Sequence, residues 1–230
     1  MVLRKFLGVV ASFLIVFSAP FAMAGIPDVN QCDSYFTEPL DDKVIVFVVP
    51  GSEPDAPLNE AVEVGHPYPA PQVIVNATIE VIVQDAAGVP IPNFPNEDIW
   101  LECPPGVDIP EGDTDVYVGL VPCFGGASAD MNTDPDGWTY FQDPFYAGGQ
   151  SFGPSRIVIN GNGLPNTVNM GFNSSDINGD GVVNLIDLQT FTADFFDAPA
   201  YHFRSDFYYD EIVNLIDLPW MARTYGSNCP

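Results

Sequence analysis

The sequence has few basic residues. Six Lys and Arg stand against 31 Asp and Glu, and the formal net charge is −25. A surface with this balance repels nucleic acids and anionic lipids, so neither is an expected partner. It attracts cations, although adaptation to a saline habitat would produce the same composition. The charge therefore excludes partners and does not name one.

Zinc motifs are also lacking. The chain contains no H-E-x-x-H and no C-x-x-C, and its two histidines, His66 and His202, stand in unrelated contexts. We predict that the protein is not an enzyme. A glycoside hydrolase is the less favoured alternative, because a pair of carboxylates can cleave a glycosidic bond. The sequence does not single out such a pair among its 31 acids.

Long apolar segments are absent apart from one at the N-terminus. Arg4 and Lys5 precede an apolar run from Phe6 to Phe17, and Ala22-Met23-Ala24 supplies the small residues of a cleavage site. The run is shorter than the roughly 20 residues of a spanning helix, and its flanks are typical of a signal peptide. We predict a signal peptide over residues 1–24, no membrane span, and a secreted or cell-surface protein.

All four cysteines follow that segment. An even number in an oxidising compartment predicts two disulfides, for which three pairings are possible. Cys103 and Cys123 bracket a loop rich in Pro, Gly and Asp, so we expect them to pair locally. Cys32 and Cys229 would then join the two ends of the mature chain.

Residues 25–172 show short strands and turns, without helical periodicity of useful length. Lys43 to Val49 is a continuous β-branched and aromatic run, and apolar residues alternate with polar ones from Val75 to Gln84. Further strands are expected at 99–101, 116–118, 138–141, 156–159 and 167–172, the last two forming a hairpin. This pattern predicts a mainly β domain built as an antiparallel sandwich.

Two turns in this domain carry a family likeness. The stretch from Gln84 to Pro92 contains an acidic-small-Gly turn followed by Pro, and the stretch from Thr133 to Trp138 contains a second Asp-Gly turn. In this respect Val73 to Phe172 resembles the invasin-like bacterial immunoglobulin-type domains. The resemblance implies an immunoglobulin-like β-sandwich with a spacer or adhesive role.

The stretch from Asp176 to Asp187, called here the first loop, has the spacing of an EF-hand calcium loop. Oxygen-bearing side chains stand at positions 1, 3, 5, 9 and 12, and Gly181 stands at position 6. Calcium takes roughly six to eight oxygens, and alternate side chains of a tight loop converge on one point. The expected ligands are Asp176, Asn178, Asp180, Val182 through its carbonyl, Asn184 and Asp187. A helix is expected over Leu185 to Phe196.

An internal repeat follows. The letters NLIDL of residues 184–188 recur at 214–218, and Asp206 and Asp210 occupy the places of Asp176 and Asp180. Two calcium loops, each followed by a helix, resemble a dockerin domain over Ser175 to Tyr225. The resemblance implies a C-terminal module over residues 173–230, Ca²⁺ as the cofactor and a cohesin-like extracellular domain as the partner.

The second loop, residues 206–217, departs from the pattern. Tyr208 occupies the third position and Glu211 replaces the glycine at the sixth. We expect a weak or empty site, because Tyr supplies no carboxylate or amide oxygen and Glu resists the positive φ of a glycine. Its remaining ligands are Asp206, Asp210, Ile212 through its carbonyl, Asn214 and Asp217. Pro219 predicts that the second helix starts late or bends.

The residues at positions 10 and 11 of each loop are apolar where many cellulosomal dockerins carry Ser-Thr. Leu185, Ile186, Leu215 and Ile216 form either a different docking face or a face packed on the sandwich.

A carbohydrate-binding accessory protein is the alternative function. An aromatic platform of Trp138, Tyr140, Phe141, Phe145 and Tyr146 would bind polysaccharide, and packing of these rings in the core is the favoured explanation.

Overall fold

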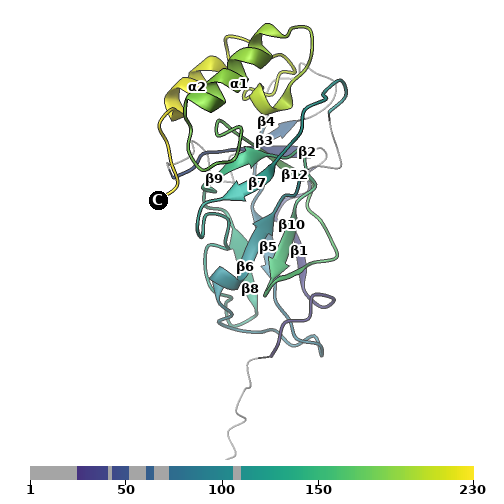
Figure 1. Cartoon of the computed structure of the whole chain (residues 1–230). Helices are drawn as coiled ribbons and strands as arrows, with labels where there is room; N and C mark the ends of the chain where they lie inside the picture. Colours follow the sequence, from purple (N-terminus) through teal and green to yellow (C-terminus); the bar gives the residue numbers. More distant parts are fainter. Residues whose placement is uncertain (1–24, 41–42, 52–60, 65–72, 106–109) are drawn as a thin grey trace, which may run out of the picture.

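The computed structural model describes residues 25–40, 43–51, 61–64, 73–105 and 110–230. It shows a β-rich body capped at one end by two helices (Figure 1). The expected signal peptide, residues 1–24, lies outside the described residues, as does His66. Within the described ranges, neither helix has the length and apolar character needed to cross a membrane.

The body is built from short strands grouped in four sheets, ordered β1-β5-β8, β11-β10-β6, β12-β2-β3-β4 and β7-β9. Neighbouring strands are antiparallel except for β12 and β2, which are parallel. The prediction of a mainly β chain with antiparallel sheets is confirmed. The strands are β1 Asp33–Phe36, β2 Lys43–Val48, β3 Ala61–Val64, β4 Val73–Val75, β5 Ile79–Ile82, β6 Ile99–Glu102, β7 Gly119–Pro122, β8 Trp138–Phe141, β9 Ala147–Gln150, β10 Arg156–Ile159, β11 Asn162–Gly163 and β12 Met170–Ser174.

Side chains that alternate between buried and more exposed positions along the strands form the main core. On β5, Ile79 and Val81 are buried while Glu80 is half-buried, as the period of two requires. Phe141 on β8 joins the same cluster, together with residues of β6 and β10 such as Leu101. Complete burial of one such side chain contributes about 1.5–3 kcal/mol. The core is therefore formed by strands of different sheets, which come from distant segments of the chain.

Three expected strands differ from the structure. The run from Val75 to Gln84 divides, because the Asn76 side chain accepts from the N–H of Thr78 at 3.1 Å and turns the chain between β4 and β5. Residues 116–118 form no strand; β7 begins just after them. The hairpin partner of β10 is the short β11, whereas β12, which contains Phe172, pairs with β2 instead.

The two helices begin as the sequence predicts. Helix α1 spans Leu185–Phe196, and Asn184 and Asp187 close its N-terminus with a capping box. Helix α2 spans Leu218–Thr224 and has Pro219 in its first turn, three residues later in the repeat than the start of α1. The late start of the second helix is thus confirmed. Two short 3-10 helices, η2 Asn96–Asp98 and η3 Phe203–Ser205, complete the elements.

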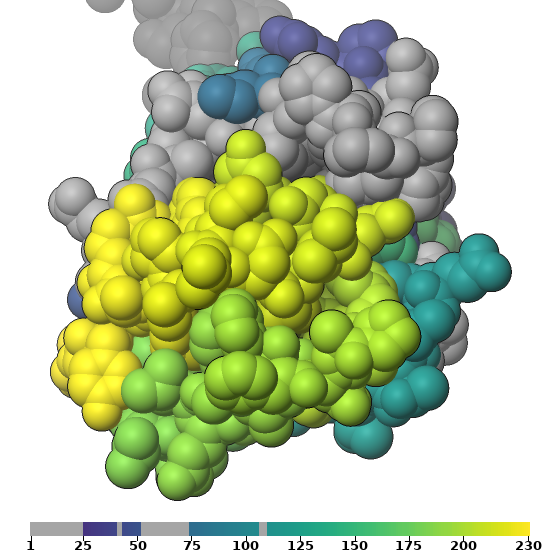
Figure 2. Space-filling model, turned by 90° about the horizontal axis from the view of Figure 1, so that it is seen from above, coloured from purple at the N-terminus to yellow at the C-terminus, as the bar shows by residue number. Residues whose placement is uncertain are grey.

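The helical end packs directly on the body. The ring of Phe47 on β2 contacts the rings of Phe207 and Trp220 edge to face, and Tyr117 contacts Phe203 in the same way. Asn173 on β12, itself fully buried, donates to the carbonyl oxygens of Phe203 and Asp206. Figure 2 looks down on this end, where the C-terminal residues, in green and yellow, cover the centre of the view.

The predicted disulfide pairing is wrong. The structure joins Cys123 to Cys229, with the two Cα atoms 5.4 Å apart, and leaves Cys32 and Cys103 as buried thiols. Cys103 lies inside the core with its sulfur 3.8 Å from the carbonyl oxygen of Met170. Cys123 instead opens the turn of residues 123–126, after β7, and meets the C-terminal tail there. Proximity along the chain misled the prediction, because the partner of Cys123 comes from the other end of the chain.

Candidate functional site

The first loop brings its predicted residues together. The carboxylate of Asp176 accepts from the N–H groups of Asp180 and Gly181, at 3.1 and 2.8 Å. Asp187 accepts from the N–H groups of Asn178 and Asn184, at 3.2 and 2.9 Å. These bonds fold the loop back on itself, so that position 12 closes against positions 3 and 9.

The remaining oxygens of the loop also lie close together. The side-chain amide of Asn178 donates to the carboxylate of Asp180 at 2.9 Å. The amide of Asn184 donates to the carbonyl oxygen of Val182 at 3.1 Å. All six predicted ligand residues therefore take part in one hydrogen-bonded loop. They supply carboxylate, amide and carbonyl oxygens, the donor set that suits a calcium ion.

The electrostatics of the loop favour a bound cation. Asp176 and Asp187 are fully buried. The pKa of Asp176 is raised to about 6, mainly by burial and also by the nearby charges of Asp187 and Asp180, while the N–H groups of Gly181 and Asp180 oppose the shift. Burial also raises the pKa of Asp187. Buried carboxylates that repel one another are stabilised by a divalent cation, which offsets both effects.

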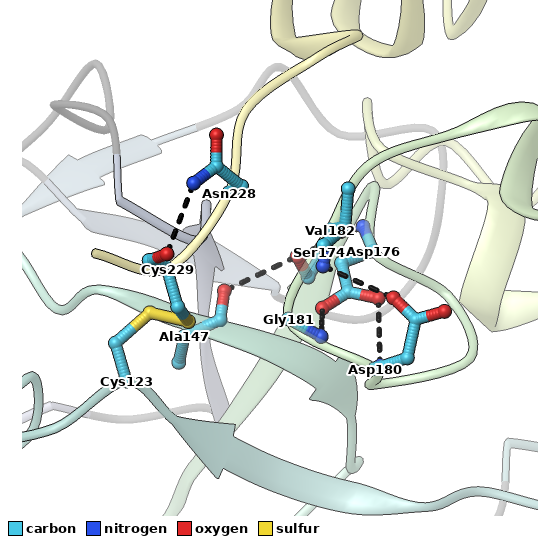
Figure 3. The surroundings of a disulfide bond; sticks show 9 residues. All are labelled: Cys123, Ala147, Ser174, Asp176, Asp180, Gly181, Val182, Asn228 and Cys229. Atoms are coloured by element: carbon cyan, nitrogen blue, oxygen red, sulfur yellow. Dashed lines mark hydrogen bonds between the residues drawn. A yellow bond between two sulfur atoms is a disulfide. The ribbon is translucent and has the colours of Figure 1, made fainter.

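The body and the C-terminal tail hold the first loop from two sides. On the body side, the N–H of Gly149 donates to the carbonyl oxygen of Asp176 at 2.8 Å, and a Cβ at Gly148 would collide with the Asp176 carboxylate. On the tail side, the N–H of Cys229 donates to the carbonyl oxygen of Gly181 at 2.8 Å. Figure 3 shows the Cys123–Cys229 disulfide beside this loop. Strand β9 and the disulfide thus meet at the candidate calcium site.

The second loop repeats the hydrogen bonds of the first. Asp206 accepts from the N–H groups of Asp210 and Glu211, at 3.2 and 2.9 Å. Asp217 accepts from the N–H groups of Tyr208 and Asn214, both at 2.9 Å. The backbone therefore adopts the same closed loop in both repeats, although only the first has the full set of predicted ligands.

Backbone strain distinguishes the two loops. Positions 4 and 6 have positive φ in both, filled by Gly179 and Gly181 in the first loop and by Tyr209 (φ 57°) and Glu211 (φ 62°) in the second. The left-handed conformation costs about 1–2 kcal/mol for each non-glycine residue. Glu211 thus adopts a positive φ, the conformation that we expected a glutamate to disfavour. Tyr209 is buried against Phe203, which offsets its cost.

Asp206, like Asp176, is fully buried. Its pKa is raised to about 7, mainly by burial and also by the charges of Asp217 and Asp210. The hydroxyl of Tyr201 donates to its carboxylate at 3.1 Å. The second loop thus holds its first ligand by contacts within the protein, and Phe207 beside it is buried in the helical core.

A further acidic group joins the body to the helical end, and no sequence pattern indicated it. Asp113, Asp115 and His202 offer ligand atoms within 4.8 Å of one another, and no other group of three or more His, Cys, Asp or Glu does so in the described ranges. Arg204 lies 3.1 Å from Asp115, and Nδ1 of His202 lies 3.0 Å from the same carboxylate. Arg204 also pairs with Asp194 at 2.7 Å. We interpret this group as part of an ion-pair network between the body and the helical end.

The four residues predicted as a docking face are exposed. Leu185 and Ile186 have exposed fractions of 57% and 54%, and Leu215 and Ile216 have 69% and 47%. The residues at position 7 of the two loops, Val182 and Ile212, are also exposed. The sequence left two alternatives for these side chains, a docking face or a face packed on the sandwich. Their exposure excludes packing on the sandwich. Both repeats present apolar residues to solvent at positions 7, 10 and 11.

The predicted aromatic platform is divided between core and surface. Phe141 and Phe145 are buried in the main core, so they cannot contact a ligand. Trp138 and Tyr140 lie on the outer face of β8, and Tyr146 lies half-buried after that strand. The five residues therefore do not form one platform.

No protein-family model, no curated protein and no solved structure matches the chain.

Proposed function

We propose that this chain is a secreted, calcium-binding, non-catalytic protein that docks to another extracellular protein domain. Its C-terminal module resembles a dockerin and is carried on an immunoglobulin-like β-sandwich. The partner is a cohesin-like domain with an apolar contact surface. The observation that carries the proposal is the repeated exposure of Leu185 and Ile186, and of Leu215 and Ile216, beside the two closed loops.

Calcium and docking are linked through position 12. Asp187 is an expected calcium ligand, and its carboxylate also accepts from the N–H of Asn184 to cap α1. Leu185 and Ile186 stand immediately before it, at the first turn of that helix. An ion bound at Asp187 would therefore fix the orientation of the apolar pair. Ordering these side chains before contact reduces the entropy lost on docking.

The apolar pairs suit a protein partner better than a small ligand. Exposed aliphatic side chains stand at the same positions of both repeats, and exposed apolar surface of this kind marks protein contact surfaces when it is contiguous. Their removal from water contributes roughly 25 cal/mol for each Å² buried. The negative charge of the chain favours a partner without an acidic contact surface, because like charges across an interface are repelled.

Pull-down of extracellular partners by residues 25–230, with Ca²⁺ and with EDTA, tests the proposal. We expect a partner that is retained only with calcium and lost when Leu185→Asp and Leu215→Asp are combined. Val89→Asp is the matched control, because Val89 is an equally exposed aliphatic residue on the body. Retention that is indifferent to calcium and to the double variant would contradict the proposal.

A further inference from the structure

Two adjoining hollows lie on the body, next to the Cys123–Cys229 disulfide. The larger has a volume of about 430 Å³ and is flanked by Phe124 and Tyr146. The smaller has a volume of about 150 Å³ and is flanked by Glu97 and Trp100. Both are lined by Cys123, Gly125 and Gly126, so they adjoin at this turn, and together they are called the groove here.

The groove is built on a fixed turn. The N–H of Cys123 donates to the carbonyl oxygen of Tyr146 at 2.8 Å, and the N–H of Tyr146 donates back to Gly126 at 2.9 Å. The disulfide holds the same turn at Cys123. A Cβ at Gly126 would collide with the backbone of Tyr146, so the floor of the groove is bare backbone. Rigid attachment lowers the entropy cost of binding a ligand here.

Three aromatic side chains line the two hollows, Phe124 and Tyr146 the larger and Trp100 the smaller. Phe124 is fully exposed, at 102% of its reference area, so packing within the chain does not account for it. Tyr146 and Trp100 are half-buried. The indole N–H of Trp100 donates to Glu102 at 3.3 Å, which fixes the ring. An exposed ring beside a hollow is a feature of binding sites more than of folding.

We propose that this groove binds a neutral polysaccharide chain. Sugar rings carry C–H groups on their faces, which aromatic faces attract, and hydroxyl groups at their edges. The exposed carboxylate of Glu97 and the hydroxyl of Ser128 line the smaller hollow and accept such hydroxyls. Among the described residues that line either hollow there is no Lys or Arg, and the chain carries a charge of −25. An anionic glycan would find no counter-charge.

This site is separate from the proposed docking face in both residues and ligand. The test is native electrophoresis of residues 25–230 through gels containing xyloglucan, galactomannan or mixed-linkage β-glucan, with alginate as the anionic comparison. We expect at least one neutral polymer to retard the protein and alginate to leave its mobility unchanged. Phe124→Ala and Trp100→Ala should each weaken the interaction about fivefold, the loss of one ring contact.

Exposed aromatic residues on another sheet provide the control. Tyr35 and Tyr140 are 42% and 38% exposed on β1 and β8, and Tyr35→Ala and Tyr140→Ala should leave the retardation unchanged. Phe124→Ala removes no buried area, so its thermal midpoint should match that of the parent chain. Lack of retardation by all three neutral polymers, or its loss in the Tyr35 and Tyr140 variants instead, would overturn the proposal. Neither result would bear on partner capture by the calcium module.

Discussion

The backbone N–H of Cys229 donates to the carbonyl oxygen of Gly181 at 2.8 Å, which fastens the disulfide-bonded end of the chain to the first loop. The N–H of Val183 adds a second contact, to the carbonyl oxygen of Ser227 at 2.8 Å. The tail therefore supports the loop in addition to β9. We expect the calcium affinity of the proposed site to depend on the disulfide through these bonds.

The first prediction concerns that coupling. Cys229→Ser should lower stability by about 2–5 kcal/mol, the usual effect of removing a native disulfide, and should weaken calcium binding because the tail no longer braces Gly181. Calorimetric titration of residues 25–230 measures the affinity. A reductant should reproduce the effect in the parent chain and have no further effect on the variant, since both retain Cys32 and Cys103. Equal calcium affinity in both proteins would contradict the coupling.

The second prediction ranks the two loops. Asp176→Asn should remove the tighter calcium-binding step, a loss of at least about tenfold, because the first loop has the full ligand set. Asp206→Asn, the matched change in the repeat, should leave that step nearly unchanged. Titration of both variants decides the ranking. If both weaken the same step equally, the loops are equivalent or coupled.

The third prediction concerns substitutions that should restore calcium binding in the second loop. Glu211→Gly relieves a left-handed non-glycine residue, a gain of about 1 kcal/mol, and Tyr208→Asp supplies the missing third ligand. The double variant should show a second calcium-binding step in the titration. Glu211→Ala combined with Tyr208→Asp is the control, because alanine keeps the strain while removing the charge. A second step in that control would mean that charge, and not backbone strain, limits the loop.

The fourth prediction concerns pH. Burial lowers the pKa of His202, but hydrogen bonds and charges from the facing carboxylates outweigh it, so the pKa is raised overall. The folded state therefore binds this proton more tightly than the unfolded state. The resulting stability is complete below about pH 6.5, the unfolded pKa, and is lost as the pH rises through the folded pKa. The groups that contact the ring are Asp115, Asp194 and Asp197, and Arg204 pairs with Asp115 beside it.

Thermal melts in saturating calcium, which holds the loop carboxylates ionised, measure this effect. The midpoint of the parent chain should fall above pH 6.5, and His202→Gln should flatten that slope. Arg156→Gln is a suitable control, because its ion pair with Glu102 is solvent-exposed and does not involve His202. An unchanged slope in His202→Gln would contradict the assignment.

The fifth prediction tests the attachment of the module. Asn173→Ala leaves the carbonyl oxygens of Phe203 and Asp206 without their buried donor, which costs about 1–3 kcal/mol. Urea denaturation should show this loss. Asn162→Ala removes an exposed bond to Asn160 and should cost less than about 0.5 kcal/mol. Similar losses in both variants would mean that Asn173 does not anchor the module.

Local rules predicted the loops and helices well. The spacing of Asp176, Gly181 and Asp187 sets which oxygens converge, and the structure closes the loop through these residues. Helix α1 has the predicted bounds because Asn184 and Asp187 cap it and its apolar residues share a face. These features depend on residues within a dozen positions, so the sequence alone specifies them.

Contacts between segments that are distant in the sequence could not be predicted in the same way. β12 could extend the hairpin from Arg156, but it pairs with β2, from residues more than a hundred positions earlier. The partner of Cys123 depends on where the C-terminal tail lies, and the ion pair of Asp115 with Arg204 depends on how the module is seated. Each is decided by competition among segments for the same core.

The sequence by itself determined the acidic character, the β-rich class, the two loops and the apolar pairs beside them. The tertiary structure decided that those pairs face solvent, that Phe141 and Phe145 fill the core, and that the groove beside Phe124 exists. The physical reason is that local hydrogen bonds are fixed by neighbouring residues. Exposure, by contrast, depends on which distant surfaces pack together, and the apolar residues of this chain outnumber the places that its cores can bury.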